Sequence, residues 1–202
     1  MSTKKTYPKM LIMIVAAMLL FGIMATLVIN QANKSRSNLQ IWNTLSDFEF
    51  TAAYNGQPFG LEQMKGKLTV VDFIFTRCKS ICPVTMLNMA DLYNLYEGSD
   101  KVQFVSISVD PENDSLAVLN EFGKKYGVHD NRWIFLRAPI EEVARVCEKD
   151  FMLPAENLPG GHTSKFILVD QDGNIRSYHE GLDSDAMNAL KNNIRQLARK
   201  MP

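Results

Sequence analysis

The sequence predicts an α/β domain with a central mixed sheet flanked by helices, preceded by one N-terminal transmembrane helix. Three observations support this prediction. Two runs, 68–75 and 102–109, are rich in β-branched and aromatic residues, as in central strands covered on both faces. Segments with helical spacing alternate with such runs, which is typical of an open sheet that is parallel at its centre. The run 10–29 is apolar over about 30 Å of helix, the thickness of a bilayer's hydrocarbon core.

The apolar run predicts an uncleaved membrane anchor. Among the residues of 10–29, only Gly22 and Thr26 are not strongly apolar, so the stretch lacks the polar face of a soluble helix. Lysines at positions 4, 5 and 9 precede it and place the N-terminus on the cytoplasmic side. A cleaved signal peptide is the alternative, but no small-x-small site follows the run.

The charged residues divide the chain into the same two parts as the apolar run, a basic N-terminal segment and an acidic remainder. The net charge is zero, from 22 basic and 22 acidic residues, which argues against a strongly basic nucleic-acid binder. Five of the basic residues and none of the acids lie in the first 36 positions, so the remainder carries a net charge of −5. We therefore expect a cytoplasmic N-terminus at 1–9, an anchor at 10–29, a linker at 30–46 and a soluble domain at 47–202. The soluble domain is expected on the periplasmic, extracytoplasmic side of a bacterial-type inner membrane.

The first half of the soluble domain leads from a strand and turn into a β–α–β unit. Residues 48–54 predict a strand, Asn55-Gly56-Gln57-Pro58 a turn, and 61–64 a short further segment. The buried strand 68–75 then passes through Thr76-Arg77-Cys78 into a predicted helix at 83–97, and the second buried strand, 102–109, follows.

The second half adds three helices, a short strand and a hairpin. Asp114 or Ser115 is expected to cap a helix carrying Leu116, Leu119, Phe122 and Tyr126. A strand at 133–136 and a helix at 141–149 follow, and then strands 165–170 and 175–179 around the turn 171–174. Asp183-Ser184-Asp185 caps a last helix, in which we expect Ala186, Leu190, Ile194 and Leu197 to face inward.

Two cysteines stand where the first buried strand passes into a helix. Sites in open sheets form beyond the carboxyl ends of strands, so this location favours a function for Cys78 and Cys82. Their spacing puts both sulfurs on one face of a helical turn, close enough to share an ion or to form a disulfide. The helix N-terminus, Arg77 and Lys79 favour the thiolate. A structural disulfide is the alternative in an exported domain, but a bridge over so small a loop would stabilise weakly.

The histidines are harder to interpret from the residues alone. His162 lies in a glycine-flanked loop, Gly160-Gly161-His162-Thr163-Ser164, and such a residue is more often solvated surface than a ligand. If it approaches the cysteines, two thiolates and an imidazole make a three-coordinate site of the type that suits copper. A structural zinc site would ask for a fourth protein ligand. His129 and His179 are interpreted as surface residues.

A set of motifs in order resembles the Sco/SenC family. The likeness runs from about Phe48 to Leu197 and rests on five segments: Phe73-Ile-Phe-Thr-Arg-Cys78-x-x-x-Cys82-Pro83, Val105-Ser-Ile-Ser-Val-Asp-Pro-Glu112, Trp133-Ile-Phe-Leu136, His162-Thr-Ser164 and Val169-Asp-Gln-Asp-Gly173. The resemblance implies a thioredoxin-like fold on a single N-terminal anchor.

The resemblance also implies a cargo and partners. It makes Cys78, Cys82 and His162 the ligands of one copper ion, Cu(I) or Cu(II). It implies a role in the assembly of cytochrome c oxidase, chiefly of the CuA centre in its subunit II. The expected partners are that subunit or another cuproprotein, a copper donor chaperone and a thiol reductant, with no nucleic acid among them.

Several residues depart from the family pattern or stay open. Lys79-Ser80 stands where the family often has Pro-Asp. The lysine should lower the thiol pKa values and shift the balance from metal retention toward thiol exchange, with Cu(I) thiolates that tolerate the cation as the alternative. Cys147 lies outside the motif and is predicted as a buried core residue, with a resolving thiol as the alternative. Met86 and Met89 have the helical spacing of core residues, with thioether ligands as the alternative. Asp72 is either an acid that assists proton transfer at the cysteines or a residue at the sheet edge.

Two functions are compatible with these residues. The first is a copper-binding assembly factor, and the second is a thiol-disulfide oxidoreductase in which Cys78 or Cys82 attacks a partner disulfide. Three residues between the cysteines favour the first, because dedicated exchangers usually have two. A thiol peroxidase is disfavoured, because the segment 72–78 lacks the proline expected upstream of a peroxidatic cysteine.

Overall fold

The structure is a computed structural model that describes the backbone of residues 7–36 and 39–201. Side chains are described for residues 11–27 and 39–201. The chain divides into two compact units, Met1–Leu39 and Gln40–Pro202. Most of the predicted cytoplasmic segment, 1–6, and part of the predicted linker, 37–38, lie outside the described residues.

The N-terminal unit contains one helix, α1 (Tyr7–Arg36). Among the residues searched, which are those the structure describes, no helix meets both the length and the hydropathy required of a membrane span. The predicted anchor, 10–29, extends at both ends beyond the described side chains, so it stays a prediction.

The second unit is built on an eight-stranded mixed sheet with the order β1-β8-β7-β4-β5-β6-β2-β3. The central strands β4, β5 and β6 are parallel, and the pairs β4–β7, β7–β8, β1–β8, β6–β2 and β2–β3 are antiparallel. The strand bounds are β1 (Asn43–Thr44), β2 (Glu49–Ala52), β3 (Pro58–Gly60), β4 (Leu68–Ile74), β5 (Val102–Ser108), β6 (Trp133–Arg137), β7 (Lys165–Val169) and β8 (Asn174–Glu180).

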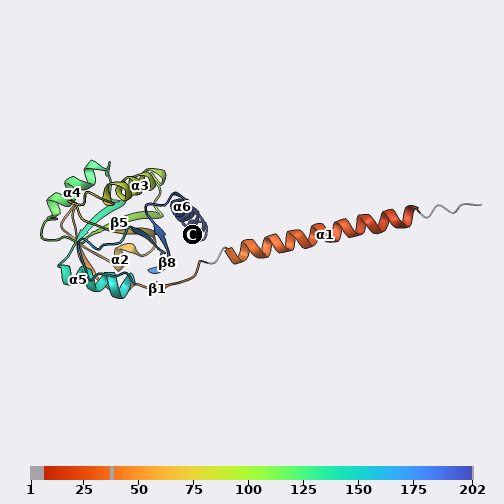
Figure 1. Cartoon of the computed structure of the whole chain (residues 1–202), viewed down its shortest axis with the longest axis horizontal. Helices are drawn as coiled ribbons and strands as arrows, with labels where there is room; N and C mark the ends of the chain where they lie inside the picture. Colours follow the sequence, from red (N-terminus) through yellow and green to blue (C-terminus); the bar gives the residue numbers. More distant parts are fainter. Residues whose placement is uncertain (1–6, 37–38, 202) are drawn as a thin grey trace, which may run out of the picture. The chain divides into compact units, whose positions relative to one another are not determined.

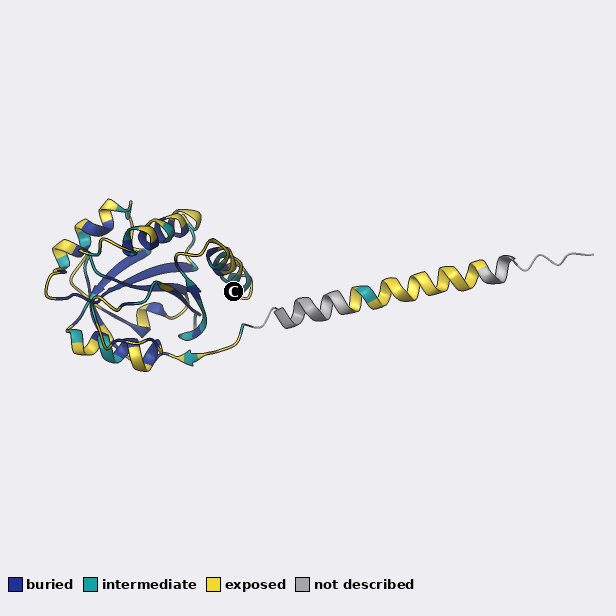
Figure 2. Ribbon diagram, in the orientation of Figure 1, coloured by how far each residue is buried: buried dark blue, intermediate teal, exposed yellow. Residues whose placement is uncertain are grey.

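The two apolar runs of the sequence occupy the centre of this sheet. Every residue of β4 and β5 is buried, as Figure 2 shows by the dark blue of the central strands. A strand covered by helices on both faces has no solvated side, so its sequence is apolar without alternation. This explains why both strands were predictable within one residue at each end.

Helices cover both faces of the sheet (Figure 1). On one face, α3, α4 and α6 pack over the sheet. Aromatic rings make contacts there: the ring centroids of Tyr93 in α3 and Phe104 in β5 are 6.0 Å apart, and those of Phe122 in α4 and Phe135 in β6 are 6.2 Å apart. On the other face, α2, α5 and the π-helix η1 enclose the main apolar cluster. The helix bounds are α2 (Leu61–Met64), α3 (Cys82–Leu95), α4 (Leu116–Lys125), α5 (Ile140–Arg145), η1 (Val146–Asp150) and α6 (Ser184–Ala198).

Three details differ from the sequence prediction, and the cap of α4 is decided between its two predicted candidates. The predicted helix 141–149 is a short α-helix that continues as the π-helix η1. Ser115, not Asp114, caps α4, because its side chain accepts the Val118 amide. In α6, Leu190, Ile194 and Leu197 are buried as predicted, but Met187 is the fourth buried residue and Ala186 is only half-buried. The strands β1 and β3 are too short to carry a periodic signal and were not predicted.

Candidate metal centre

The candidate site lies beyond the carboxyl end of β4. Cys78 follows this strand in a loop, and Cys82 is the first residue of α3. His162 precedes β7, which runs antiparallel to β4 in the register Val71↔Ile167. Because the strands run in opposite directions, the start of β7 lies at the same sheet edge as the end of β4. The topology therefore brings together segments that are 80 residues apart.

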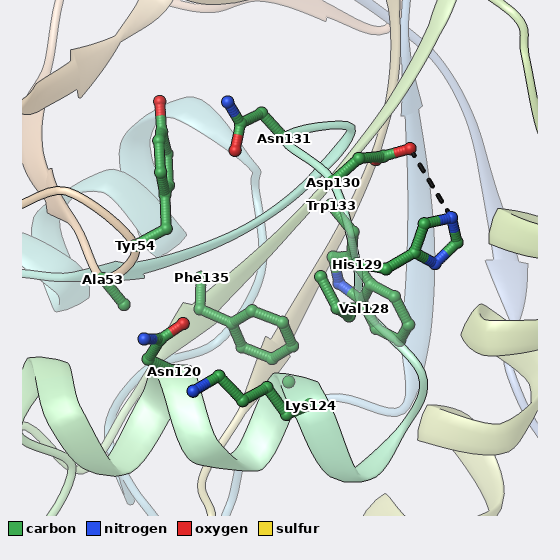
Figure 3. Close-up of a pocket in the computed structure, with 11 residues that line it drawn as sticks. Ala53, Tyr54, Asn120, Lys124, Val128, His129, Asp130, Asn131, Trp133 and Phe135 are labelled. Atoms are coloured by element: carbon green, nitrogen blue, oxygen red, sulfur yellow. Dashed lines mark ion pairs between the residues drawn. The ribbon is translucent and has the colours of Figure 1, made fainter.

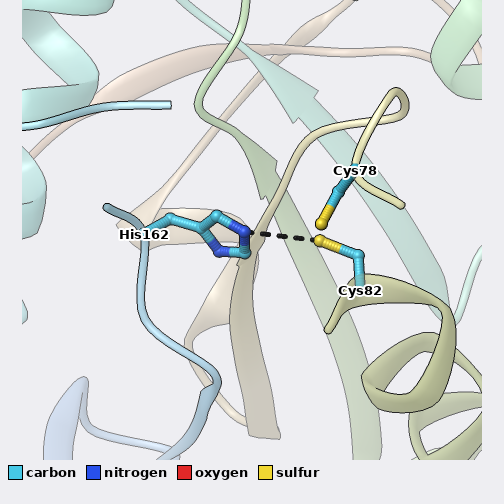
Figure 4. Close-up of side chains that lie close together, drawn as sticks. All are labelled: Cys78, Cys82 and His162. Atoms are coloured by element: carbon cyan, nitrogen blue, oxygen red, sulfur yellow. Dashed lines mark hydrogen bonds between the residues drawn. The ribbon is translucent and has the colours of Figure 1, made fainter. Parts of the chain in front are cut away.

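At this edge the side chains of Cys78, Cys82 and His162 face one another (Figure 4). Their potential ligand atoms, the two Sγ atoms and an imidazole nitrogen, all lie within 4.8 Å of one another. His162 Nε2 is 3.4 Å from Cys82 Sγ. All three cysteines of the chain are free thiols in the structure. Among the described residues, this is the one cluster of at least three histidine, cysteine or acidic side chains with metal-binding geometry.

The orientation of His162 presents Nε2 to the sulfurs. Its Nδ1 lies 3.0 Å from the carbonyl oxygen of Thr163. A carbonyl accepts hydrogen bonds only, so Nδ1 carries the proton and Nε2 carries the lone pair. The Phe75 ring packs edge-on against the imidazole at 5.2 Å, and His162 is 9% exposed. The ring is thus held with its acceptor nitrogen toward the Cys82 sulfur.

The two cysteines differ in their electrostatics. At Cys78, burial opposes ionisation, but hydrogen bonds from the Cys82 thiol, the Ser80 hydroxyl and both backbone amides outweigh it and lower the pKa to about 6. At Cys82, burial and the hydrogen bond that it donates to Cys78 raise the pKa to about 12, with a contribution from the charges of Cys78 and Asp72. Before any ligand binds, the pair therefore holds one thiolate, on the partly exposed Cys78, and one thiol, on the buried Cys82.

Comparison with known proteins identifies the family. A profile described as SCO1/SenC matches residues 38–199. The chain belongs to the SCO1/SenC family. A curated relative, the SCO1 protein homolog of Bacillus subtilis, is 34% identical over 136 residues, which are 64% of this chain and 70% of that protein.

Solved structures agree with this family assignment. BsSco, described as a member of the Sco family of cytochrome c oxidase assembly proteins with a disulfide switch, superposes with a TM-score of 0.70 at 28% identity, covering 79% of this chain and 96% of that one. ScoI of Bradyrhizobium japonicum with copper bound superposes with a TM-score of 0.59 at 25% identity, covering 74% and 99%. The expected thioredoxin-like α/β fold with a mixed sheet is confirmed.

Asp72 is a central residue of this SCO1/SenC domain, and the edge alternative is wrong. It lies in the middle of β4, is 3% exposed, and pairs in register with Ser106 of β5. Burial raises the pKa of Asp72 to about 7, and neither of its carboxylate oxygens has a hydrogen-bond partner among the described residues. The acid lies close enough to Cys82 for its charge to raise the thiol pKa.

Met86, Met89 and Cys147 belong to the core, as predicted. Met86 and Met89 are 0% exposed on the inner face of α3. Cys147 is 2% exposed in η1, belongs to the apolar cluster on the opposite face of the sheet, and directs its Sγ at the Pro154 carbonyl at 3.9 Å. Burial, with the charge of Glu148, raises the pKa of this thiol to about 12. Cys147 is therefore poorly placed to act as a resolving thiol.

The other two histidines divide between surface and interior. The His129 side chain is 53% exposed, and its surface assignment is confirmed. The prediction for His179 is wrong, because this residue is 7% exposed between β8 and α6. Its Nε2 lies 2.8 Å from Ser177 Oγ and 3.2 Å from Asn193 Nδ2, and burial lowers its pKa. The prediction failed because polar residues occupy both faces of β8, so no alternation of polar and apolar residues marks the buried face.

Two features of the site were missed from the sequence. Ser80, between the cysteines, places its hydroxyl 3.5 Å from Cys78 Sγ and helps to lower the thiol pKa. Asp114 accepts hydrogen bonds from Thr76, two residues before Cys78. The position of Ser80 between the two cysteines could have indicated its role. The position of Asp114 indicated a different role, because an aspartate before a helix is ordinarily interpreted as a cap.

A pocket of about 290 Å³ opens elsewhere in the domain, between α4 and the start of β6 (Figure 3). Trp133 and Phe135 stack at 5.4 Å in its wall. Its charged groups have partners: Lys124 pairs with Glu121 at 2.7 Å, and Asp130 pairs with Arg132 at 2.9 Å. None of the residues of the Cys78–Cys82–His162 cluster lines this pocket, so it is separate from the candidate metal centre.

Proposed function

We propose that this protein binds one copper ion through Cys78, Cys82 and His162 and delivers it to a cuproprotein, chiefly the CuA centre in subunit II of cytochrome c oxidase. The single observation that carries the proposal is the convergence of two sulfurs and one imidazole nitrogen within 4.8 Å. Soft thiolates with one imidazole suit copper, and a structural zinc site would require a fourth ligand. The copper-bound ScoI structure and the description of BsSco support the same cargo and target.

The differences between the ligands suggest an order of events. Cys78 is already a thiolate at neutral pH and partly exposed, so it is the side chain that meets incoming Cu(I) first. Cys82 must lose its proton to ligate, since only the thiolate binds metal. His162 needs no proton change at Nε2, because its proton sits on Nδ1. Release of copper to an acceptor would follow the reverse order. The exposed Cys78 would then be the last of the three ligands that the acceptor replaces.

We also propose that the run 10–29 anchors the domain to the outer face of a bacterial-type inner membrane. Its support is the length and unbroken apolar character of the run together with the lysines that precede it. On this proposal the domain works in an oxidising compartment, where a thiol reductant must keep Cys78 and Cys82 reduced and a copper donor must supply the ion.

A second function is favoured by the lowered pKa of Cys78. As a thiol-disulfide oxidoreductase, the Cys78 thiolate would attack a partner disulfide, form a mixed disulfide and expel one partner thiolate. Cys82, once deprotonated, would then attack Cys78 Sγ and expel the second thiolate. The partner gains two electrons and is reduced, and the chain keeps a Cys78–Cys82 disulfide.

A transfer assay tests the first function against the second. The chain, loaded with one Cu(I) under anaerobic conditions, is mixed with the reduced, metal-free CuA domain of subunit II, and the copper content of each protein is measured after separation. We expect the wild type to transfer copper and Cys78→Ser to fail at loading. In a parallel assay the CuA domain is offered as its disulfide, without copper. Reduction of that disulfide together with an absence of copper transfer would favour the oxidoreductase.

A further inference from the structure

A buried carboxylate holds the loop that carries Cys78. Asp114 is 0% exposed and lies between β5 and α4. It accepts hydrogen bonds from Thr76 Oγ1 at 2.5 Å and from Ser108 Oγ at 2.6 Å. The Thr76 amide also donates to both carboxylate oxygens, at 3.3 and 3.2 Å. One carboxylate thus joins the start of the cysteine loop to the end of β5.

This link is stronger than the other side-chain tie described between the same two segments. Arg77 pairs with Asp110 at 3.2 Å, but the Arg77 side chain is 63% exposed, so water and salt screen the pair. The Asp114 bonds are shielded from water, and hydrogen bonds to a charged acceptor are stronger than neutral ones. Ser115 caps α4, so capping does not account for the placement of Asp114.

Cys78 is the member of the cluster that depends on this link. Cys82 is held by the backbone of α3, and His162 is held by its hydrogen bond to the Thr163 carbonyl and by the Phe75 ring. Cys78 lies in the loop between β4 and α3, two residues after Thr76. We propose that Asp114, acting through Thr76, is a positioning residue that holds Cys78 Sγ against Cys82 and His162. The consequence for copper rests on the proposed function, whereas the consequence for the cysteine pair itself does not.

A matched pair of variants isolates the link. Replacing Asp114 would remove every bond of a buried hub and could unfold the domain, so the donors are changed instead. Thr76→Val and Ser108→Ala each remove one hydroxyl donor from the same carboxylate, and valine keeps the shape of threonine. Ser108→Ala also removes the acceptor of the Asp110 amide, so it should lose at least as much stability as Thr76→Val in chemical denaturation of the full chain. Thr76→Val loosens the segment that carries Cys78 directly, whereas Ser108→Ala reaches that segment only through the exposed Arg77–Asp110 pair.

Two readouts then report on the site. The first uses no metal: the equilibrium of the Cys78–Cys82 disulfide with glutathione, in which two glutathiones are oxidised as the disulfide becomes two thiols. The second is the Cu(I) affinity in competition with a chelator. For Thr76→Val we expect the equilibrium constant with glutathione and the Cu(I) dissociation constant each to change by roughly tenfold. This is the effect of losing about one good hydrogen bond. For Ser108→Ala we expect both to stay within roughly twofold of the wild type.

The outcomes separate this proposal from the proposed function. Equal effects of the two variants on the glutathione equilibrium, or no effect of Thr76→Val, would overturn the positioning role even if the wild type binds copper. If the wild type fails to bind Cu(I) while Thr76→Val alone shifts the glutathione equilibrium, the positioning role stands and the copper function falls.

Discussion

Nε2 of His162 lies 3.4 Å from Sγ of Cys82, although 80 positions of sequence separate the two residues. The Thr163 carbonyl holds the imidazole proton on the far nitrogen, so the nitrogen that faces Cys82 carries the lone pair. On the proposed function, the same geometry would present Cys82 and His162 to one copper ion.

Alkylation should distinguish the three cysteines. At pH 7 we expect iodoacetamide to modify Cys78 first, because its pKa is lowered to about 6 by hydrogen bonds that outweigh its partial burial. Cys82 and Cys147, whose pKa values burial raises to about 12, should react far more slowly. Peptide mass spectrometry against time gives the order. Labelling of Cys82 or Cys147 at a rate equal to that of Cys78 would contradict the assignment of the thiolate.

Copper binding should release about one proton at pH 7.5, because only Cys82 still carries a proton that must leave. The measurement is anaerobic titration with Cu(I) in a weakly buffered indicator solution. A release of about two protons would show that both cysteines start as thiols, and the lowered pKa of Cys78 would then be wrong.

The stability of the chain should fall between about pH 4 and pH 7 because of Asp72. Burial raises its pKa in the folded state to about 7 from an ordinary value of 3.8, so in this window the folded state keeps a proton that the unfolded chain has lost. Folding is therefore favoured at the acid end, and that advantage, on the order of 3 kcal/mol, is lost as the pH rises through 7.

The variant Asp72→Asn removes this titration. Chemical denaturation at several pH values should show that the difference in unfolding free energy between variant and wild type shifts in favour of the variant from pH 4 to pH 8. Taking the difference cancels the opposite contribution of His179, whose lowered pKa makes folding more favourable as the pH rises toward its ordinary value of 6.5. A difference that does not vary with pH would show that Asp72 titrates normally in the folded protein.

Cys147→Ser should destabilise the fold without affecting the metal centre. The residue is 2% exposed in the apolar cluster, and a buried hydroxyl in place of a thiol costs about 1–2 kcal/mol. Cu(I) affinity and the glutathione equilibrium of the Cys78–Cys82 pair should match the wild type. If either changes by tenfold, Cys147 takes part in the chemistry as a resolving thiol.

Some of the fold and site could be predicted from the sequence because the signal was local. The strands β4 and β5 are buried on both faces, which leaves continuous apolar runs, and Cys78 and Cys82 stand four positions apart at the end of one of them. Burial of Met86 and Met89 followed from helical spacing in the same way.

The rest depends on contacts between distant segments. His162 lies in a loop without periodicity, so its residues alone favoured solvated surface, and the family resemblance was needed to place it among the ligands. The hydrogen bond between Asp114 and Thr76 joins residues that are 38 positions apart. Its one sign in the sequence is an aspartate before a helix, which is also typical of a helix cap. His179 was misplaced because its burial comes from α6 packing across β8, a tertiary contact.

The most direct test of the account is an anaerobic Cu(I) competition titration of the reduced chain, with Cys78→Ser, His162→Ala and, as the control, His129→Ala. The account predicts one copper per chain for the wild type and the control. It predicts near loss of binding for Cys78→Ser and affinity weakened by at least roughly tenfold for His162→Ala, since a ligand should matter no less than the outer groups that support one. Wild-type affinity in both Cys78→Ser and His162→Ala would contradict it.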